Sequence, residues 1–338
     1  MPETARLTYA GAVNAALDRL LASSPDVLLY GEDVALPGGV FGVSKGLRAK
    51  YGDRVFDTPI SESAILGSAI GAALFGARPI VEIMWADFLL VALDQLVNQA
   101  ANVRYLSRGT AVAPITVRTQ QGTQPGACAQ HSQSLEALLA HIPGLRVCLP
   151  ANAQDAHDLL LAAAAADDPV VVIENRNLYH GAKQAVRLGE PAEAVGGARI
   201  VRAGTEATLV SWGAMVPVAV AAAENLVADG LSVEVVDARW LSPFDWETTV
   251  DSVAKTGRLV VLHEANLTGG FGAEVVAGVC ERGVPQRSAP VRIALPDVRI
   301  PAAPTLLAAL VPSVDTVVER VRLACGRKEN AWSGNGSS

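Results

Sequence analysis

Cysteine is scarce and scattered in this sequence. The four cysteines, Cys128, Cys148, Cys280 and Cys325, lie far apart and form no CxxC pair. This spacing argues against a zinc site and a disulfide framework, and it fits a reducing compartment. Aromatic residues make up only 5% of the chain, whereas half of its residues are hydrophobic. Because alanine and glycine dominate the apolar content, we expect helices packed closely on sheets.

Clusters of basic residues and long apolar runs are also lacking. The net charge is −7, and no block of lysine and arginine occurs. Nucleic acid and anionic membranes are therefore poor partners. The N-terminal residues show no basic region followed by an apolar core, and the nearly uncharged run 64–77 is too short to span a bilayer. We expect a soluble cytoplasmic protein.

Short β-branched runs alternate with longer helical patterns along the chain. Several of the runs are uninterrupted apolar segments, as expected for strands covered on both faces of a sheet. This alternation predicts an α/β fold with mostly parallel sheets. Strands are predicted at 26–34, 114–120, 145–150, 169–174, 207–213, 232–238 and 258–265, and helices at 92–107, 152–166 and 216–230.

The length of 338 residues suggests two domains. A polar, poorly periodic segment at 186–200 is the expected linker between a first domain, 1–185, and a second domain, 201–326. The last residues, 327–338, are too polar to pack, and we expect a disordered tail there.

Glu62 stands where an apolar helical run begins, in DTPISESAILG. A carboxylate in the first turn of a helix is commonly a partner of the helix dipole, with Ser61 or Thr58 available for capping. It gains a chemical role if it faces a dry pocket, where burial raises its pKa and lets it share a proton with a bound base. The residues alone leave both interpretations open.

Three other stretches also carry two interpretations each. His131, in GACAQHSQS, lies in a predicted loop, where it serves function or caps a helix that starts near Ser132. Phe88, in a predicted strand-to-helix segment, is a core residue or a binding aromatic. The glycines of LTGGFGAE match neither GxGxxG nor a P-loop, so close packing is the simpler explanation. The absence of HExxH and GxSxG argues against a self-contained metalloenzyme or hydrolase.

Many further motifs occur in a fixed order. They are GEDV, KYGDRVFDTPISES, GARPIVEIMWADF, LDQLVNQAANVRY, AQHSQSLEALLAHIPGLRV, DPVVVIEN, LSPFDWETTVDSVAKTGRLVVLHEA, GGFGAEV and PVRIALPDVRIP. From about residue 6 to residue 325 the chain resembles the beta subunit of the thiamine-diphosphate-dependent 2-oxo-acid dehydrogenases, the decarboxylating components of the pyruvate, branched-chain 2-oxo-acid and acetoin dehydrogenase complexes. The resemblance implies two doubly wound domains, a pyrimidine-binding domain followed by a transketolase C-terminal-like domain.

The resemblance gives Glu62 a role. It corresponds to the family's glutamate that meets the aminopyrimidine ring of thiamine diphosphate. A proton shared between the carboxyl group and the ring prepares the cofactor to attack the carbonyl of a 2-oxo acid, which then loses carbon dioxide. The apolar neighbours Ile60, Ala64 and Ile65 are expected to keep the carboxyl group dry.

The resemblance also assigns four other positions. Phe88 corresponds to the aromatic that packs on the pyrimidine ring, Ile60 helps to hold the cofactor's bent shape, and Glu32 is an acidic residue near the same pocket. His131 corresponds to a histidine at the mouth of the active site. There it stabilises charge on the substrate-derived adduct or passes a proton during acyl transfer to a lipoyl group.

One half of the family's cofactor site is missing. The chain has no GDG followed some thirty residues later by NN, the pattern that holds Mg²⁺ and the diphosphate in this family. The resemblance therefore implies an alpha subunit in an α2β2 heterotetramer, with 93–105 in an interface helix and a dihydrolipoyl acyltransferase core as a further partner. It also implies a structural K⁺ held by main-chain carbonyls near Ile115, Ala163, Ala165 and Asp168.

Two departures from the family pattern leave the substrate open. Ala302 and Ala303 follow PDVRIP where the family commonly has an aromatic, and TQQGTQPGACAQ matches poorly. The substrate therefore stays open among pyruvate, a branched 2-oxo acid and acetoin. Two alternative functions remain, the pyrimidine-binding subunit of a split transketolase-like synthase and a non-catalytic scaffold. DTPISES and HSQS argue against the first, and the retained Glu62, Phe88 and His131 against the second.

Overall fold

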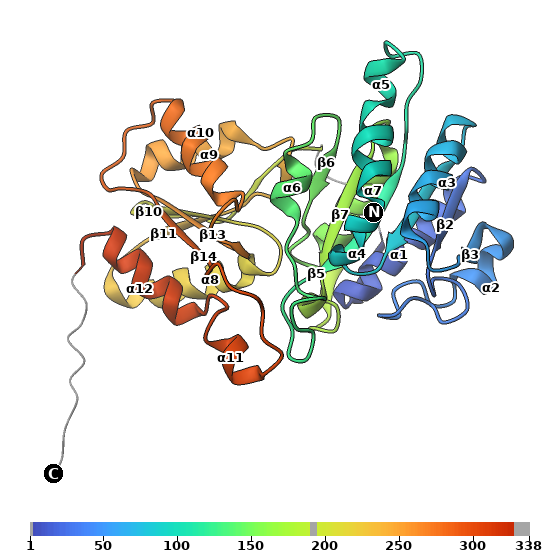
Figure 1. The fold of residues 1–338 in the computed structure, drawn as a ribbon. Coiled ribbons are helices and arrows are strands. Elements are labelled where there is room, and N and C mark those ends of the chain that lie inside the picture. Colours follow the sequence, from blue (N-terminus) through green and yellow to red (C-terminus); the bar gives the residue numbers. More distant parts are fainter. Residues whose placement is uncertain (1–2, 190–194, 328–338) are drawn as a thin grey trace.

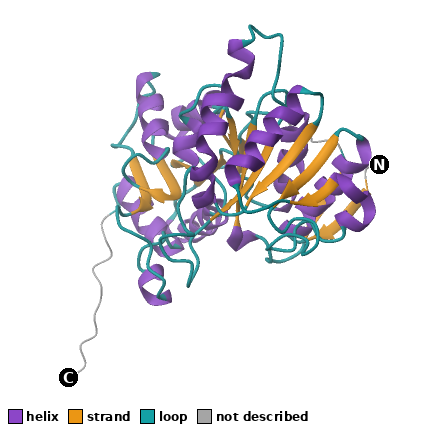
Figure 2. Cartoon of the chain, turned by 45° about the vertical axis from the view of Figure 1, so that its right-hand side comes forward, coloured by secondary structure: helices purple, strands orange, loops and turns teal. Residues whose placement is uncertain are grey.

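The computed structural model describes residues 3–189 and 195–327, which contain two mainly parallel sheets (Figures 1 and 2). The first has seven strands in the order β12-β6-β7-β5-β4-β2-β3. All its pairings are parallel except that of β12 with β6. The strands are β2 Val27–Gly31, β3 Val55–Asp57, β4 Arg78–Ile83, β5 Thr116–Gln121, β6 Arg146–Cys148, β7 Val170–Asn175 and β12 Trp240–Ser242.

Helices cover both faces of this sheet because its strands are apolar on both faces. Val171 and Ile173 of β7 belong to the core on one face, and Val170 and Val172 to the core on the other. This alternation follows from the two-residue period of a strand. The helices are α1 Tyr9–Ser23, α2 Leu47–Tyr51, α3 Glu62–Leu74, α4 Ala86–Leu89, α5 Val103–Leu106, α6 Glu136–Ala140 and α7 Ala153–Ala165.

The second sheet has five strands in the order β14-β13-β10-β11-β9, with β9 antiparallel to β11. Helices again lie on both of its faces (Figure 1). The strands are β9 Arg199–Arg202, β10 Ala207–Ser211, β11 Val233–Asp237, β13 Leu259–Asn266 and β14 Val291–Leu295. The helices are α8 Met215–Asn225, α9 Trp246–Thr256, α10 Gly272–Glu281, α11 Pro304–Ala308 and α12 Val314–Ala324.

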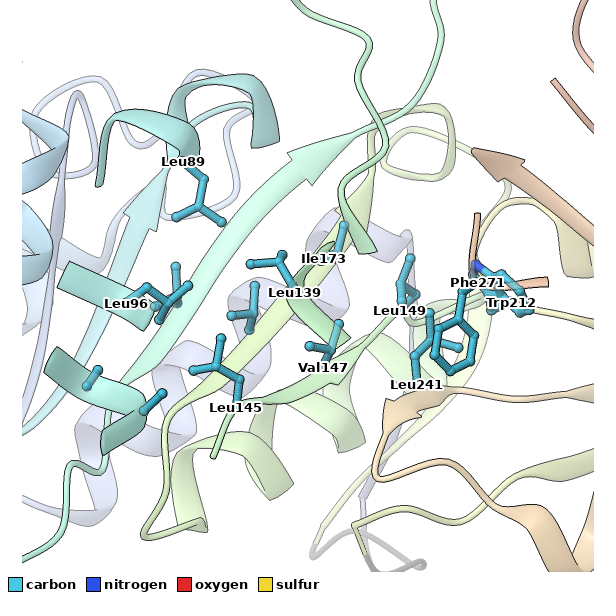
Figure 3. Close-up of a cluster of buried hydrophobic side chains, with 14 of the residues drawn as sticks. Leu89, Leu96, Leu139, Leu145, Val147, Leu149, Ile173, Trp212, Leu241 and Phe271 are labelled. Carbon is cyan, nitrogen blue, oxygen red and sulfur yellow. The ribbon is translucent and has the colours of Figure 1, made fainter. Parts of the chain in front are cut away.

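The two sheets share one continuous core. Figure 3 shows Leu149 and Ile173, from the first sheet and its flanking segment, in the same row of side chains as Trp212, Leu241 and Phe271. The chain of the second domain also lends β12 to the first sheet, beside β6. The two domains therefore pack directly against each other.

All seven predicted strands and the α/β fold are confirmed, but two helical predictions are wrong. The segment 92–107 is not one regular α-helix, because a π-helical stretch at Gln95–Gln99 separates short 3₁₀ and α turns. The helix after His131 begins at Glu136 and not near Ser132. In the described residues, no helix is long and apolar enough to cross a membrane.

The expected linker, 186–200, overlaps regular structure at both ends. β8 runs from Gln184 to Leu188 and pairs with β1, Glu3–Leu7, while β9 begins at Arg199. The residues between 190 and 194 and those from 328 to 338, where we expect the tail, lie outside the described residues. The domain boundaries stay predictions.

Candidate active site

The predicted site residues gather at the carboxyl ends of three neighbouring strands in the first sheet. Glu32 follows β2, Phe88 lies just beyond β4, and His131 lies on the segment after β5. The chain goes from β2 to β3 on one side and then crosses to β4 on the other. Open α/β sheets bind ligands at such a switch point, outside the carboxyl ends of the strands.

Two carboxyl groups lie close enough at this point for one to act on the pKa of the other. Glu62 begins α3, and although Ser61 is the N-cap residue, its side chain makes no capping hydrogen bond. Burial, followed by the negative charges of Glu62 and Asp33, raises the pKa of Glu32 above its ordinary value. Glu32 is only 8% exposed. Crowding of like charges in a buried site favours a proton held on one carboxyl group.

Three rings pack together beyond the carboxyl ends of β4 and β5. The centroid of the Trp85 ring lies 5.7 Å from that of Phe88 and 5.0 Å from that of His131, and the Phe88 and His131 centroids lie 5.4 Å apart. Each pair meets edge to face, an arrangement that aromatic rings prefer. The structure thus brings Phe88 and His131 together and adds Trp85, whose backbone is held at the unusual φ of +60°.

Unpartnered polar atoms at the carboxyl ends of β2, β4 and β5 fit an aminopyrimidine. Four of the buried side-chain atoms there have no hydrogen-bond partner in the part of the chain that the structure describes, although buried polar atoms normally have one. They offer acceptors and donors at once, as a ring with an amino group and ring nitrogens requires. These atoms are Glu32 Oε1, Asp87 Oδ2, Trp85 Nε1 and Gln120 Nε2.

The loop that carries His131 is tied to the site by two buried charged side chains. Arg176 donates to the main-chain oxygens of Gly122 and His131, the second at 2.5 Å. Asp87 accepts from the main-chain and side-chain nitrogens of Gln133, at 3.3 and 3.0 Å. Burial lowers the pKa of Arg176, and the negative charges of Asp87 and Glu264 oppose that shift.

Comparison with known proteins gives the family. Residues 5–181 match the pyrimidine-binding domain of transketolase, and residues 196–317 match its C-terminal domain. The chain is 40% identical over 328 residues to the beta subunit of acetoin:2,6-dichlorophenolindophenol oxidoreductase from Cupriavidus necator, covering 94% of this chain and 97% of that one. The chain belongs to the family of 2-oxo-acid dehydrogenase beta subunits. Members of this family depend on thiamine diphosphate.

Other relatives of this dehydrogenase-type beta subunit agree. The pyruvate dehydrogenase E1 component subunit beta of Staphylococcus epidermidis is 42% identical over 299 residues, which is 88% of this chain and 92% of that protein. A solved structure described as a split-gene transketolase, an inactive beta4 tetramer, has a TM-score of 0.76 and 24% identity, covering 96% of this chain and all of that one. It confirms the predicted pair of domains at the level of the fold.

One expectation about this family member's site is wrong for the chain by itself. Ile65 is buried, but Ile60 is 83% exposed and Ala64 is also exposed, so these neighbours do not enclose Glu62. Val91, whose main-chain oxygen accepts from Ser63 Oγ at 2.7 Å, is exposed as well. Exposed apolar residues therefore lie next to the start of α3.

The four positions expected near K⁺ lie on the other side of the sheet from the site, where the chain enters the amino ends of β5 and β7. The main-chain oxygen of Ile115 accepts from Val170 at 2.9 Å, and that of Ala163 accepts from Ala166 at 3.2 Å. Asp168 accepts from Arg104 at 2.5 Å, and Ala165 is the last residue of α7. These contacts do not test the ion, which stays a prediction. Within the described residues, no group of three metal-ligating side chains occurs.

The sequence did not reveal several residues that shape this family's site here. Trp85 and Gln120 bond to each other through the Trp85 main-chain nitrogen, which donates to Gln120 Oε1 at 3.3 Å. Arg176 follows directly after the apolar strand β7. A buried polar side chain at the carboxyl end of a parallel strand was the signal that could have found Gln120 and Arg176.

Proposed function

We propose that this chain is the beta subunit of a 2-oxo-acid dehydrogenase that works with thiamine diphosphate in an α2β2 complex. The complex decarboxylates a 2-oxo acid oxidatively and transfers the acyl group to a lipoyl group. The observation that carries the proposal is that Glu32, Phe88 and His131 follow the carboxyl ends of neighbouring strands at the switch point of a sheet, with Glu62 near enough to Glu32 to act on its pKa. The 40–42% identity to named dehydrogenase subunits supports it.

The carboxyl residues hold a proton for the cofactor. In the proposal Glu62 donates its proton to a nitrogen of the pyrimidine ring. Glu32 provides a second carboxyl group nearby, and burial raises its pKa. Phe88 packs on the ring, and Ile60 supports the cofactor's bent shape. Bound thiamine diphosphate supplies a nucleophilic carbon and an electron sink for the decarboxylation.

His131 acts at the mouth of the site. Its ring meets those of Trp85 and Phe88 edge to face, and Arg176 donates to its main-chain oxygen. From this place the imidazole holds or passes a proton at an oxygen of the substrate, and it does so again when the acyl group leaves for the lipoyl group.

The partners follow from what the chain lacks and exposes. We propose that an alpha subunit holds Mg²⁺ and the diphosphate, and that it covers Ile60 at the open side of Glu62. A dihydrolipoyl acyltransferase core carries the lipoyl group that accepts the acyl group. A structural K⁺ at the main chain of Ile115, Ala163, Ala165 and Asp168 and a cytoplasmic location, which the scattered cysteines favour, belong to the same proposal.

The test is turnover by the complex. The chain is co-expressed with its alpha subunit and given thiamine diphosphate, Mg²⁺, an artificial electron acceptor, and pyruvate, 2-oxoisovalerate or acetoin. One substrate should be turned over. Glu62→Gln should lower that rate by at least about 100-fold, the usual size of a proton-transfer contribution. Glu247→Gln, which also alters the first turn of a helix, should leave it unchanged.

The opposite results are equally clear. A wild-type rate in Glu62→Gln would overturn the role of that carboxyl group. A well-formed complex with bound cofactor that turns over none of the three substrates would favour a scaffold subunit instead.

A further inference from the structure

The segment that carries His131 has no regular structure of its own. From residue 122 to residue 135 it forms no helix or strand, between the end of β5 and the start of α6. The place of the His131 ring therefore depends on the side chains that hold this loop, which we call the His131 loop. Figure 1 shows that it extends beyond β5 toward the segment before α11 in the second domain.

A carboxylate of the second domain holds the start of the His131 loop. Glu264, on β13, accepts from the main-chain nitrogen of Thr123 at 2.6 Å and from its hydroxyl at 2.7 Å through the same oxygen. Its other oxygen accepts from Asn175 Nδ2 at 2.7 Å. Glu264 is 4% exposed, so these bonds are shielded from water. Bonds of this kind, to an ionised acceptor, are the strong ones.

Further contacts restrict the position of the His131 loop. Gly122 has a φ of +117°, and a Cβ there would lie 2.7 Å from Asn175 Oδ1, so the main chain passes directly over that amide. Farther along the loop, the Gly126 nitrogen donates to the main-chain oxygen of Ala302 in the second domain, at 3.0 Å. The first domain holds the same loop through Arg176. Both domains thus position it.

We propose that Glu264 is a positioning residue of this active site, because its carboxylate ties the His131 loop to the second domain and so places the imidazole. The inference rests on the proposed function in one respect, the role of His131. It extends that function by making the second domain, which contributes none of the proposed site residues, necessary for the geometry of the site.

The chemistry of the three bonds explains why a carboxylate stands there. All three partners donate, and a carboxylate can accept on both of its oxygens. Glu264→Gln turns one acceptor into a donor, which then faces a donor of Thr123 or Asn175. Thr123→Val removes one donor and leaves the main chain intact, whereas Thr123→Ser keeps the hydroxyl.

The test measures both the loop and the reaction in the complex with the alpha subunit. Hydrogen exchange read by mass spectrometry should be at least about ten-fold faster across 122–135 in Glu264→Gln and in Thr123→Val. The kcat for the 2-oxo acid should fall about 10- to 100-fold, the cost of misplacing a reacting group by roughly 1 Å, with KM little changed. Thr123→Ser should restore both measurements.

Glu234→Gln is the matched control. Glu234 is also buried in the second domain, where it accepts from Ser252 and Gly204 and pairs with Lys255, and none of these partners belongs to the His131 loop. This variant should leave exchange in 122–135 and kcat unchanged. If Glu264→Gln does not fold, Thr123→Val with Thr123→Ser decides the question.

Three results would overturn the inference, and each differs from failure of the proposed function. Unchanged hydrogen exchange across 122–135 in both test variants would show that Glu264 does not hold the His131 loop. Faster exchange with unchanged kcat removes the positioning role. An equal effect of Glu234→Gln reduces the result to general destabilisation. A wild-type complex without turnover would overturn the proposed function, while the exchange measurements would still report on Glu264.

Discussion

Among the single residues, the buried His263 makes the free energy of unfolding depend on pH. It stacks on Trp212 with ring centroids 5.3 Å apart. Burial, and then the positive charge of Arg292, lowers the pKa of His263 from 6.5 to about 4. Above pH 6.5 the ring is neutral in the folded and unfolded chains alike. Between pH 6.5 and pH 4 only the unfolded chain gains the proton, so stability falls as the pH falls, by up to about 3 kcal/mol.

Urea unfolding at pH 7, 5.5 and 4.5 checks this expectation. The wild type should lose more free energy of unfolding between pH 7 and pH 4.5 than His263→Asn, which has no titrating ring. His180→Asn is the control, because His180 is exposed and its replacement should keep the wild-type slope. Equal slopes in the wild type and in His263→Asn would contradict the assignment.

Single residues were predictable where a local motif carries them. Glu62, Phe88 and His131 stand in recognisable short stretches, and the structure brings the last two into contact. Glu264 was not predictable, because its partner Thr123 lies 141 positions away and no local pattern records that pairing. The openness around Glu62 could not be predicted either, since exposure depends on what the rest of the fold covers.

Among the strands, the end of β2 packs closely against the neighbouring strand β4 at Gly31. A Cβ at Gly31 would lie 2.4 Å from the main-chain oxygen of Glu82, on the adjacent strand β4. Gly31→Ala must push the two strands apart just before Glu32. We expect it to lower the free energy of unfolding by about 2 kcal/mol, within the range of strongly destabilising substitutions. Urea unfolding measures the loss.

Gly71→Ala is the matched control for this substitution. Gly71 lies inside α3, and a Cβ there would meet nothing within 4 Å. Alanine favours a helix over glycine by about 0.8–1.0 kcal/mol, so this variant should be more stable than the wild type. If both glycine variants changed stability equally, close contact between β2 and β4 would not be the cause.

Elements were predictable where the apolar pattern decides them. All seven expected strands formed because their runs are buried on both faces. The π-helical stretch at Gln95–Gln99 leaves the apolar pattern of its segment nearly intact, so periodicity alone did not reveal it. Before the start of α6, Asp87 accepts from the main-chain and side-chain nitrogens of Gln133, a contact with a distant part of the chain that no local pattern predicts.

At the scale of the whole molecule, the described surface leaves large apolar side chains uncovered at α5, which projects from the body of the first domain (Figure 1). Tyr105 and Leu106 are both largely exposed there. Tyr105 is the last residue of the segment 93–105 that we predicted as an interface helix, and Leu106 follows it. Exposed aromatic residues of this kind commonly supply much of the binding free energy of an interface.

We therefore expect Tyr105→Ser to weaken the complex with the alpha subunit. Loss of a central aromatic costs about 2 kcal/mol or more, which raises the dissociation constant roughly 30-fold. Sedimentation of the co-expressed complex over a dilution series measures the change. Val227→Ser, at an exposed apolar residue of the second domain, should sediment as the wild type does. Because Tyr105 is exposed, the fold should survive its replacement, and a complex that stays intact on dilution would place the alpha subunit on another face.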